Sequence, residues 1–195
     1  MSGEKRLALR QKIGIYGGTF DPVHNGHLIL AREARERLEL HTIIFVPAAV
    51  SPFKNTPSGS AADRLAMLQA AIAGEPGFAI DEFELHRPPP SYTIDTVENI
   101  RARQSDAELF YLIGQDNVIG LTKWHRSSDL QKLVQFVVLD RTVESPNHGY
   151  HVIQRKVDIS ATEIRNRVAS DRSIRYLVPE SVNEIIKSRR LYQET

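Results

Sequence analysis

The chain has 195 residues, of which 41% are hydrophobic and 25% are charged, a composition typical of a globular domain. Lys and Arg (25) nearly balance Asp and Glu (24), so there is no general basic surplus for binding nucleic acid. The lack of cysteine excludes a disulfide scaffold and fits a cytoplasmic protein, and no apolar run reaches membrane-spanning length. We expect a single domain over residues 1–195, with residues 1–11 as a loose, charged arm rather than a signal peptide.

The first predicted elements are a strand over residues 13–16 and a helix over residues 25–40. The strand is an unbroken apolar run, and the helix follows from the spacing of four between Leu30, Ala34 and Leu38. A loop that leaves a strand and enters a helix presents free N–H groups and the positive end of the helix dipole, which favours phosphate. The loop between these two elements is therefore the first candidate site.

This loop carries residue types that suit an anion. Gly17 and Gly18 lack a Cβ, so the backbone there can approach a ligand closely and can adopt a positive φ. His24 and His27 lie side by side if the helix begins near Asn25, and both are hydrogen-bond donors that can also carry charge. The pattern is neither Gly-x-Gly-x-x-Gly nor the Walker phosphate loop. We interpret the loop as a phosphate cradle.

Two other interpretations of the loop stay open at this point. The glycines could serve only a tight turn, with the histidines as ordinary surface residues of a first helical turn. The histidines could instead bind zinc, but zinc needs three or four ligands, and the sequence has no cysteine and no His-Glu-x-x-His pattern. We therefore expect no protein-bound metal site.

Strands and helices alternate along the rest of the chain. Further strands are predicted over residues 42–46, 78–80, 109–113, 136–139 and 150–153. We expect the strand over residues 78–80 to continue as an extended segment through residue 85. Further helices are predicted after residue 60, after residue 93, from about residue 128, over residues 160–168 and over residues 179–191. This alternation predicts an α/β, Rossmann-like, doubly wound and mainly parallel sheet with helices on both faces.

In such folds ligands bind at the carboxyl ends of the strands, near the point where the strand order switches. The loop with His24 and His27 follows the first strand, and Gly114 and Asp116 follow the strand over residues 109–113. Both segments should therefore face the same crevice.

Three further candidates each have a plain structural explanation. Lys54 lies in a Pro-bounded loop and could reach a phosphate, but alone it is more simply a surface lysine. Asp116 could cap the helical turn that follows it. Trp124 is the sole tryptophan, and a lone tryptophan is more often a core residue than a ligand-stacking one.

Capping also explains much of two later segments. Ser91 and Thr93 are residue types that favour a helix start. Ser160, with Glu163 three residues later, is a complete capping box on the pattern alone. Arg165, however, lies on the first turns of that helix, beside free N–H groups that attract anions.

The loop Gly17–His27, Gly-Gly-Thr-Phe-Asp-Pro-Val-His-Asn-Gly-His, resembles the signature of the nucleotidyltransferase superfamily that carries a His-x-Gly-His motif. Later segments resemble, in the same order, those of bacterial nicotinate-mononucleotide adenylyltransferases: Val46–Lys54, Ser91–Thr96, Gly114–Asp116, Trp124–His125 and Ile159–Arg165. Phe53 stands where that family usually has histidine. The resemblance covers residues 13–192.

The resemblance implies transfer of the adenylyl group of ATP to nicotinate mononucleotide, which gives nicotinate adenine dinucleotide and pyrophosphate in NAD biosynthesis. Mg²⁺ would arrive with ATP. The implied catalytic residues are His24, His27, Lys54 and Arg165. The implied ATP-binding residues are Gly17, Gly18, Thr19, Phe20, Gly114, Asp116, Ile159, Ser160 and Thr162. The implied nicotinate mononucleotide-binding residues are Thr93, Trp124, His125 and Arg141.

The nearest alternative is the same chemistry on another phosphorylated acceptor, such as nicotinamide mononucleotide or phosphopantetheine, or a cytidylyl transfer. A second alternative is a non-catalytic regulator that binds nucleotide on the same fold.

Overall fold

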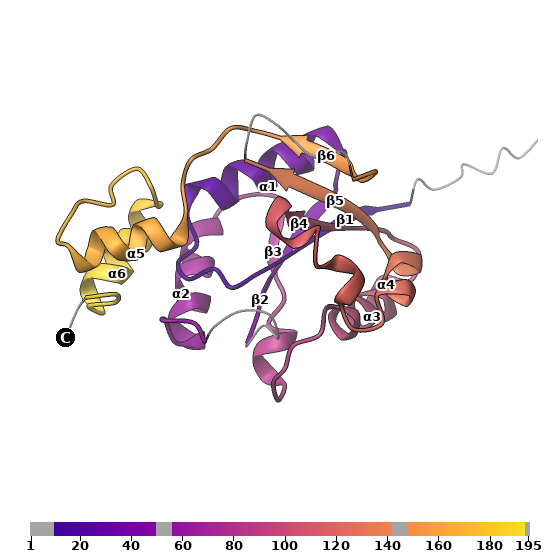
Figure 1. The fold of residues 1–195 in the computed structure, drawn as a ribbon, viewed down its shortest axis with the longest axis horizontal. Coiled ribbons are helices and arrows are strands. Elements are labelled where there is room, and N and C mark those ends of the chain that lie inside the picture. The colour runs from indigo at the N-terminus through magenta and orange to yellow at the C-terminus, as the bar shows by residue number, and fades with distance from the viewer. Residues whose placement is uncertain (1–9, 50–55, 142–147, 194–195) are drawn as a thin grey trace, which may run out of the picture.

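The computed structural model describes residues 10–49, 56–141 and 148–193. At its centre is a six-stranded sheet in the order β3-β2-β1-β4-β5-β6, and every neighbouring pair is parallel. The strands are β1 (Lys12–Gly18), β2 (Thr42–Pro47), β3 (Phe78–Ile80), β4 (Glu108–Gly114), β5 (Gln135–Asp140) and β6 (His151–Gln154). This order confirms the doubly wound parallel sheet that the alternation of elements predicts (Figure 1).

Helices cover both faces of the sheet (Figure 1). One face carries α1 (Asn25–Arg37), α2 (Ala61–Ile72), α5 (Ala161–Ala169) and α6 (Glu180–Ser188). The other face carries α3 (Thr93–Arg103) and α4 (Ser127–Leu133). Short 3-10 turns are η1 (Phe83–His86), η2 (Gln115–Asn117) and η3 (Leu121–Lys123). Within the described ranges, no helix has both the length and the apolar character that crossing a bilayer requires.

The two faces of the sheet bury separate hydrophobic clusters, because successive side chains of a strand point to opposite sides. In β4, Leu112 belongs to the cluster under α1 and α2, whereas Leu109 and Ile113 belong to the cluster under α3 and α4. Burial on both faces explains why the strands are continuous apolar runs rather than alternating ones.

The segment after β3 differs from our expectation. The chain does not continue extended through residue 85 but forms the turn η1. The side chain of Asp81 accepts a hydrogen bond from Phe83 N at 3.0 Å, and Leu85 N donates to Glu82 O at 2.9 Å. An aspartate that holds the backbone two residues on offers the chain an alternative to strand pairing, and hydrophobic alternation alone does not reveal it.

Two helices are shorter than expected. Helix α1 ends at Arg37 rather than at residue 40, and α6 ends at Ser188 rather than at residue 191. Glu39 and Arg190, just beyond these ends, have φ values of 55° and 52°. A residue in the left-handed region ends a helix, and nothing in the hydrophobic spacing marks either position.

The strand order places the candidate site. Strands β1 and β4 are neighbours in the sheet although they lie far apart in the sequence. After β1 the chain turns into α1 on one face, whereas α3 and α4 pack on the other face. Loops that leave adjacent parallel strands in opposite directions open a crevice at their carboxyl ends.

Asp21 anchors the loop that follows β1. Its side chain is buried and accepts hydrogen bonds from Ser58 N at 2.7 Å, from Gly59 N at 2.9 Å and from the Tyr192 hydroxyl at 2.7 Å. Arg165 Nη1 donates to the Asp21 carbonyl oxygen at 2.7 Å. The loop is therefore held both by the chain entering α2 and by the C-terminal helices.

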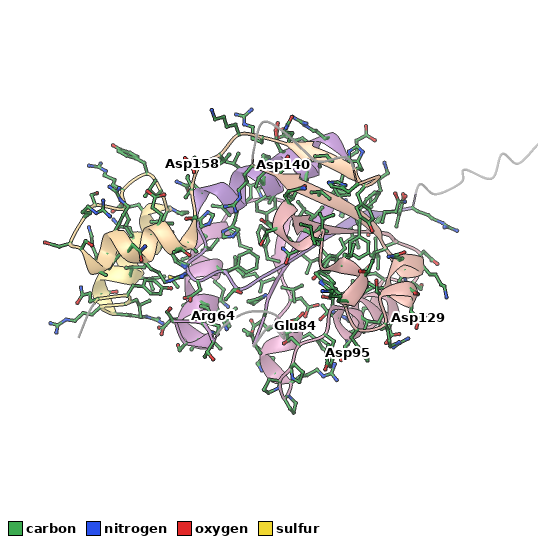
Figure 2. The ribbon with its side chains drawn as sticks, in the orientation of Figure 1. Arg64, Glu84, Asp95, Asp129, Asp140 and Asp158 are labelled. Atoms are coloured by element: carbon green, nitrogen blue, oxygen red, sulfur yellow. The ribbon has the colours of Figure 1, made fainter. Side chains whose placement is uncertain are left out.

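Arg64, on α2, adds a second anchor from beneath the loops (Figure 2). It is 1% exposed, and its Nη1 donates to the Thr19 carbonyl oxygen at 2.7 Å while Nη2 donates to the Ala49 carbonyl oxygen at 3.4 Å. Burial lowers the pKa of Arg64, and the charge of Asp21 opposes that effect. One guanidinium thus ties the loop after β1 to the loop after β2.

We expect Tyr192→Phe to lower the free energy of unfolding by about 1–2 kcal/mol, because the Asp21 carboxylate loses one buried hydrogen bond. Urea denaturation followed by circular dichroism measures this change. Tyr176→Phe is the matched control, since Tyr176 is 77% exposed. Equal stability of Tyr192→Phe and the parent protein would contradict the anchoring role of this contact.

Candidate active site

Two adjoining cavities lie at the carboxyl ends of the strands. We call the first the histidine pocket, of about 340 Å³, which His24, His27, Arg141 and Arg165 line. We call the second the tryptophan pocket, which includes Thr93, Tyr111, Trp124 and His125. Both cavities are also lined by Gly17, Gly18, Thr19, Gly114 and Asn117. The shared wall therefore comes from the ends of β1 and β4, as the expected crevice requires.

His24 and His27 form a stacked pair at the start of α1. His24 occupies the N-cap, the helix begins at Asn25, and the two rings lie 3.7 Å apart between centroids at an angle of 24°. His24 N donates to His27 Nδ1 at 3.3 Å. Because Nδ1 accepts this bond, a neutral His27 carries its proton on Nε2. The loop therefore fixes both the position and the tautomer of His27.

His24 is neutral at physiological pH in this structure. Its side chain is 2% exposed, and burial followed by the charge of Arg141 lowers its pKa from 6.5 to about 3. Its Nδ1 has no hydrogen-bond partner among the described residues. His24 can thus exchange hydrogen bonds with a ligand, but it does not supply the positive charge that we considered possible from the sequence.

Gly17 and Gly18 serve close packing rather than an unusual backbone conformation. Neither has a positive φ, so that part of our expectation is wrong; the positive φ of this loop falls on Phe20, at 50°. A Cβ on Gly17 would collide with the Tyr111 hydroxyl, and one on Gly18 would lie 2.8 Å from the Phe20 ring. The glycines are needed because aromatic side chains reach the backbone at the shared wall.

Gly26 has a similar role inside the histidine motif. A Cβ at this position would lie 3.0 Å from His24 Nδ1 and 3.1 Å from His24 Cε1. Gly26 therefore leaves room for the His24 ring, which lies close to its backbone.

Two arginines complete the histidine pocket. Arg165, on α5, is held by its bond to the Asp21 carbonyl oxygen, and its Nη2 donates to Thr162 Oγ1 at 3.3 Å. Arg141 follows β5, and its Nη1 donates to the Ile159 carbonyl oxygen at 2.8 Å. We had grouped Arg141 with the nicotinate mononucleotide-binding residues; it lines the histidine pocket instead of the tryptophan pocket. Its contact with the mononucleotide stays a prediction.

The segment at the start of α5 divides between structural and pocket roles. Ser160 Oγ accepts from Glu163 N at 3.1 Å, which confirms the N-cap, although no reciprocal bond from the Glu163 side chain completes a capping box among the described contacts. Thr162 lines the histidine pocket, whereas Ile159 and Ser160 do not. For these two, binding of ATP stays a prediction.

The other predicted ATP-binding residues lie together. Gly17, Gly18, Thr19, Phe20, Gly114 and Asp116 all line the histidine pocket. Lys54, like Phe53, falls outside the described residues, so its catalytic role stays a prediction.

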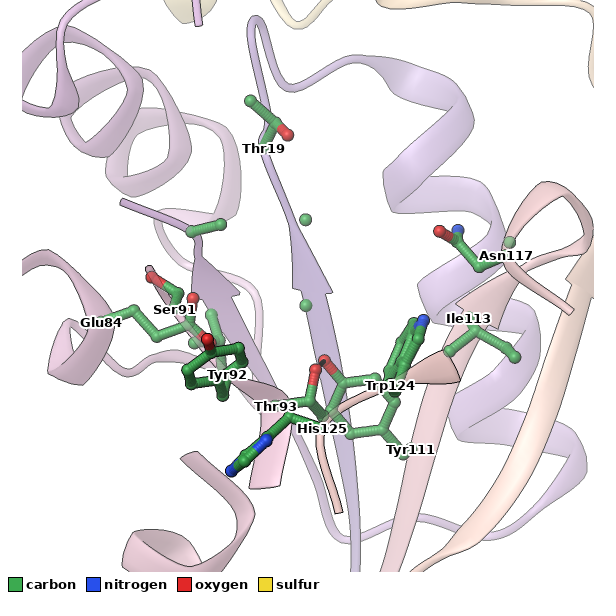
Figure 3. A pocket seen from close by; sticks show the side chains of 15 residues that line it. Thr19, Glu84, Ser91, Tyr92, Thr93, Tyr111, Ile113, Asn117, Trp124 and His125 are labelled. Carbon is green, nitrogen blue, oxygen red and sulfur yellow. Dashed lines mark hydrogen bonds between the residues drawn. The ribbon is translucent and has the colours of Figure 1, made fainter. Parts of the chain in front are cut away.

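The tryptophan pocket has aromatic walls (Figure 3). Trp124 packs edge-on against Tyr111, with ring centroids 6.0 Å apart, and against Phe136 at 6.3 Å. Tyr92 and His125 lie 4.5 Å apart between ring centroids. Trp124 therefore contacts the core and also lines the cavity, and its stacking on a ligand stays a prediction.

Sequence reasoning missed several lining residues. Tyr111 and Asn117 belong to segments that we had identified, but a tyrosine inside a buried strand and an asparagine beside Asp116 carry no signal of their own. Glu84 lies in η1, which we had expected to be extended. The local turn chemistry of Asp81 is the one signal that could have indicated η1.

Residues that could hold a metal directly are few. Across the described ranges, no three or more His, Asp or Glu side chains gather in a way that could bind a metal ion. Both carboxylate oxygens of Asp21 already accept hydrogen bonds, which leaves Asp116 as the other carboxylate that lines the histidine pocket. This set fits a Mg²⁺ ion that phosphates hold and that keeps several waters.

Comparison with known proteins places the chain in a family. Residues 15–167 match the family model described as Cytidylyltransferase-like. A protein named as a probable nicotinate-nucleotide adenylyltransferase from Exiguobacterium sibiricum is 40% identical over 190 residues, covering 93% of this chain and 98% of the relative. One from Geobacillus thermodenitrificans is 45% identical over 185 residues, covering 93% and 86%.

Solved structures show the same fold. Plasmodium falciparum nicotinic acid mononucleotide adenylyltransferase, complexed with NaAD, aligns over 94% of this chain and 98% of its own, with a TM-score of 0.77 and 18% identity. A putative nicotinate-nucleotide adenylyltransferase from Vibrio parahaemolyticus aligns over 95% and 97%, with a TM-score of 0.70 and 21% identity. Because the sequence relatives match over nearly their whole lengths, this chain belongs to the nicotinate-nucleotide adenylyltransferases of the cytidylyltransferase-like family.

Proposed function

We propose that the protein transfers the adenylyl group of ATP to nicotinate mononucleotide, giving nicotinate adenine dinucleotide and pyrophosphate. The observation that carries this proposal is the pair of cavities with a common glycine wall. A pocket with two histidines and two arginines suits a triphosphate, and a pocket with tryptophan, tyrosine and histidine suits a flat ring. Two substrates bound in these cavities would meet at the ends of β1 and β4.

The reaction needs positioning more than proton transfer. A phosphate oxygen of the mononucleotide attacks the α-phosphorus of ATP, a new P–O bond forms, and the bond between the α-phosphorus and the bridging oxygen breaks to release pyrophosphate. The attacking oxygen is already ionised at neutral pH, so no general base and no covalent enzyme intermediate are required. The protein has to hold two anions in line and stabilise charge on the α-phosphate and on pyrophosphate.

The described residues can supply that stabilisation. The guanidinium of Arg165 is oriented by Asp21 and Thr162, and His27 has a fixed donor at Nε2. His24 contributes hydrogen bonding, and its lowered pKa keeps the ring uncharged as long as no anion is bound. We propose Lys54 as a further donor from the loop after β2. Mg²⁺, bound with ATP, would neutralise part of the phosphate charge, and Asp116, which lines the histidine pocket, would orient its waters.

A panel of pyrophosphate-release assays tests the function directly. Purified protein, ATP and Mg²⁺ are combined with nicotinate mononucleotide, nicotinamide mononucleotide or phosphopantetheine in turn, and CTP replaces ATP in a parallel series. We expect the highest kcat/KM with ATP and nicotinate mononucleotide. Release with another acceptor alone would reassign the substrate, and release with none would favour a nucleotide-binding regulator. Metal content of the purified protein tests the zinc alternative, which requires stoichiometric zinc.

We expect His27→Ala to lower kcat by roughly 10²–10³, the loss typical of a donor that stabilises transition-state charge. Steady-state pyrophosphate release measures it. His41→Ala is a matched control, because His41 is exposed and lies just before β2, at the opposite end of the sheet from the pockets. A His27→Ala protein with parental kcat would remove this residue from the mechanism.

We expect Trp124→Ala to raise the KM for nicotinate mononucleotide roughly tenfold while the KM for ATP changes little, because stacking on one ring is lost. Trp124→Phe, which keeps an aromatic face, should retain much of the affinity. Melting temperatures of both variants show how much of any effect is a loss of packing. Equal losses for both substrates together with a lower melting temperature would favour a purely structural role.

A further inference from the structure

Glu84 places a carboxyl group in the tryptophan pocket. It lies on η1, is 7% exposed, and lines the cavity together with Ser91, Tyr92 and Thr93 at the start of α3 (Figure 3). Its Oε1 accepts a hydrogen bond from Thr96 Oγ1 at 2.7 Å. A buried acid at this position bears directly on which ring substituent the cavity can accept.

The surroundings of Glu84 disfavour its negative charge. Burial raises its pKa, hydrogen bonds from Thr96 and Ser91 act in the opposite direction, and the charges of Asp81 and Asp95 raise it further. In the described part of the chain, no lysine, arginine or histidine forms a salt bridge with Glu84; Arg103 pairs with Asp81, and Arg87 pairs with Asp95 at 3.2 Å. The nearby cations are thus already paired with other acids.

The other titratable groups of the cavity do not neutralise Glu84. Tyr111, on β4, is buried, and burial together with the charge of Glu84 raises the pKa of its hydroxyl. His125 and Tyr92 lie against each other on the same cavity wall. When a ring binds in the cavity, Glu84 is therefore either ionised or protonated.

If nicotinate mononucleotide is the acceptor, as proposed above, the cavity receives a second carboxylate. Two ionised carboxylates close together in one cavity repel each other, whereas a protonated acid donates a hydrogen bond to the ionised one. An amide substituent behaves differently, since its NH₂ group donates to an ionised Glu84. Protonated Glu84 thus favours a carboxylate on the ring, and ionised Glu84 favours an amide.

We propose that Glu84 is a specificity-determining residue: the acid mononucleotide binds with Glu84 protonated, and ionised Glu84 shifts the preference toward the amide mononucleotide. The proposal fixes the direction in which the acid-to-amide ratio of kcat/KM changes with pH. As pH rises, the protonated fraction of Glu84 falls, so kcat/KM for the acid falls relative to kcat/KM for the amide. Both substrates carry the same phosphate, whose own titration cancels in the ratio.

The test is the acid-to-amide ratio of kcat/KM from about pH 5.5 to about pH 9 in the parent protein, in Glu84→Gln and in Glu82→Gln. Glutamine keeps an oxygen for Thr96 and imitates the protonated acid. Glu82→Gln changes a neighbouring acid that does not line the cavity. We expect the ratio to fall by roughly tenfold in the parent protein and in Glu82→Gln, and to stay within about twofold in Glu84→Gln.

A parallel fall of the ratio in Glu84→Gln, or a parent ratio that is flat or rises with pH, would overturn the inference. If the variant does not fold, calorimetry of the parent protein in two buffers of different ionisation enthalpy gives an independent readout. Binding of the acid mononucleotide above neutral pH should be accompanied by uptake of a proton. Binding without proton uptake would also overturn the inference. These results differ from failure of the proposed function, in which the acid mononucleotide is not adenylylated at any pH.

Discussion

The parallel pairing of β1 with β4 is the constraint on which the site depends. Residues 13–16 of β1 lie beside residues 109–112 of β4, and both strands are buried on both faces. Because α1 leaves toward one face and α3 and α4 cover the other, a crevice opens above these two strand ends. The two cavities occupy that space, and their common wall comes from the ends of the two strands and the residues just after them.

The wall between the two cavities is thin, and the loop that forms part of it is held in place by residues outside the crevice. Gly17 and Gly18 make it thin, since Tyr111 and Phe20 leave no room for a Cβ. Rigidity comes from outside the crevice, through Asp21, which accepts hydrogen bonds from the entrance to α2 and from Tyr192. Tyr192, which follows α6, therefore contacts a residue 171 positions earlier in the chain, so the C-terminal segment is not an independent appendage.

The fold was largely predictable because parallel strands and their helices leave a strong hydrophobic pattern, and the loop after β1 was predictable because its residue types have a clear chemistry. The pattern could not show long-range contacts made by single side chains. The bond from Arg141 to the Ile159 carbonyl oxygen, which holds this side chain in the histidine pocket, is such a contact, and binding of the mononucleotide by Arg141 stays a prediction. Glu84 was missed because the turn that carries it is stabilised by local contacts, among them the hydrogen bond that the Asp81 side chain accepts from Phe83 N. The spacing of residues along the sequence reveals neither of these contacts.

The two pockets differ in what they can discriminate. The histidine pocket gathers two arginines and backbone donors around one cavity, and such groups recognise phosphates whatever is attached to them. The tryptophan pocket instead combines a ring-sized aromatic surface with one buried acid, and a substituent is accepted or rejected there according to its charge. Reaction type and acceptor choice are thus set by different walls of one crevice, so a change in Trp124 or Glu84 can alter the acceptor while the chemistry of the histidine pocket stays the same.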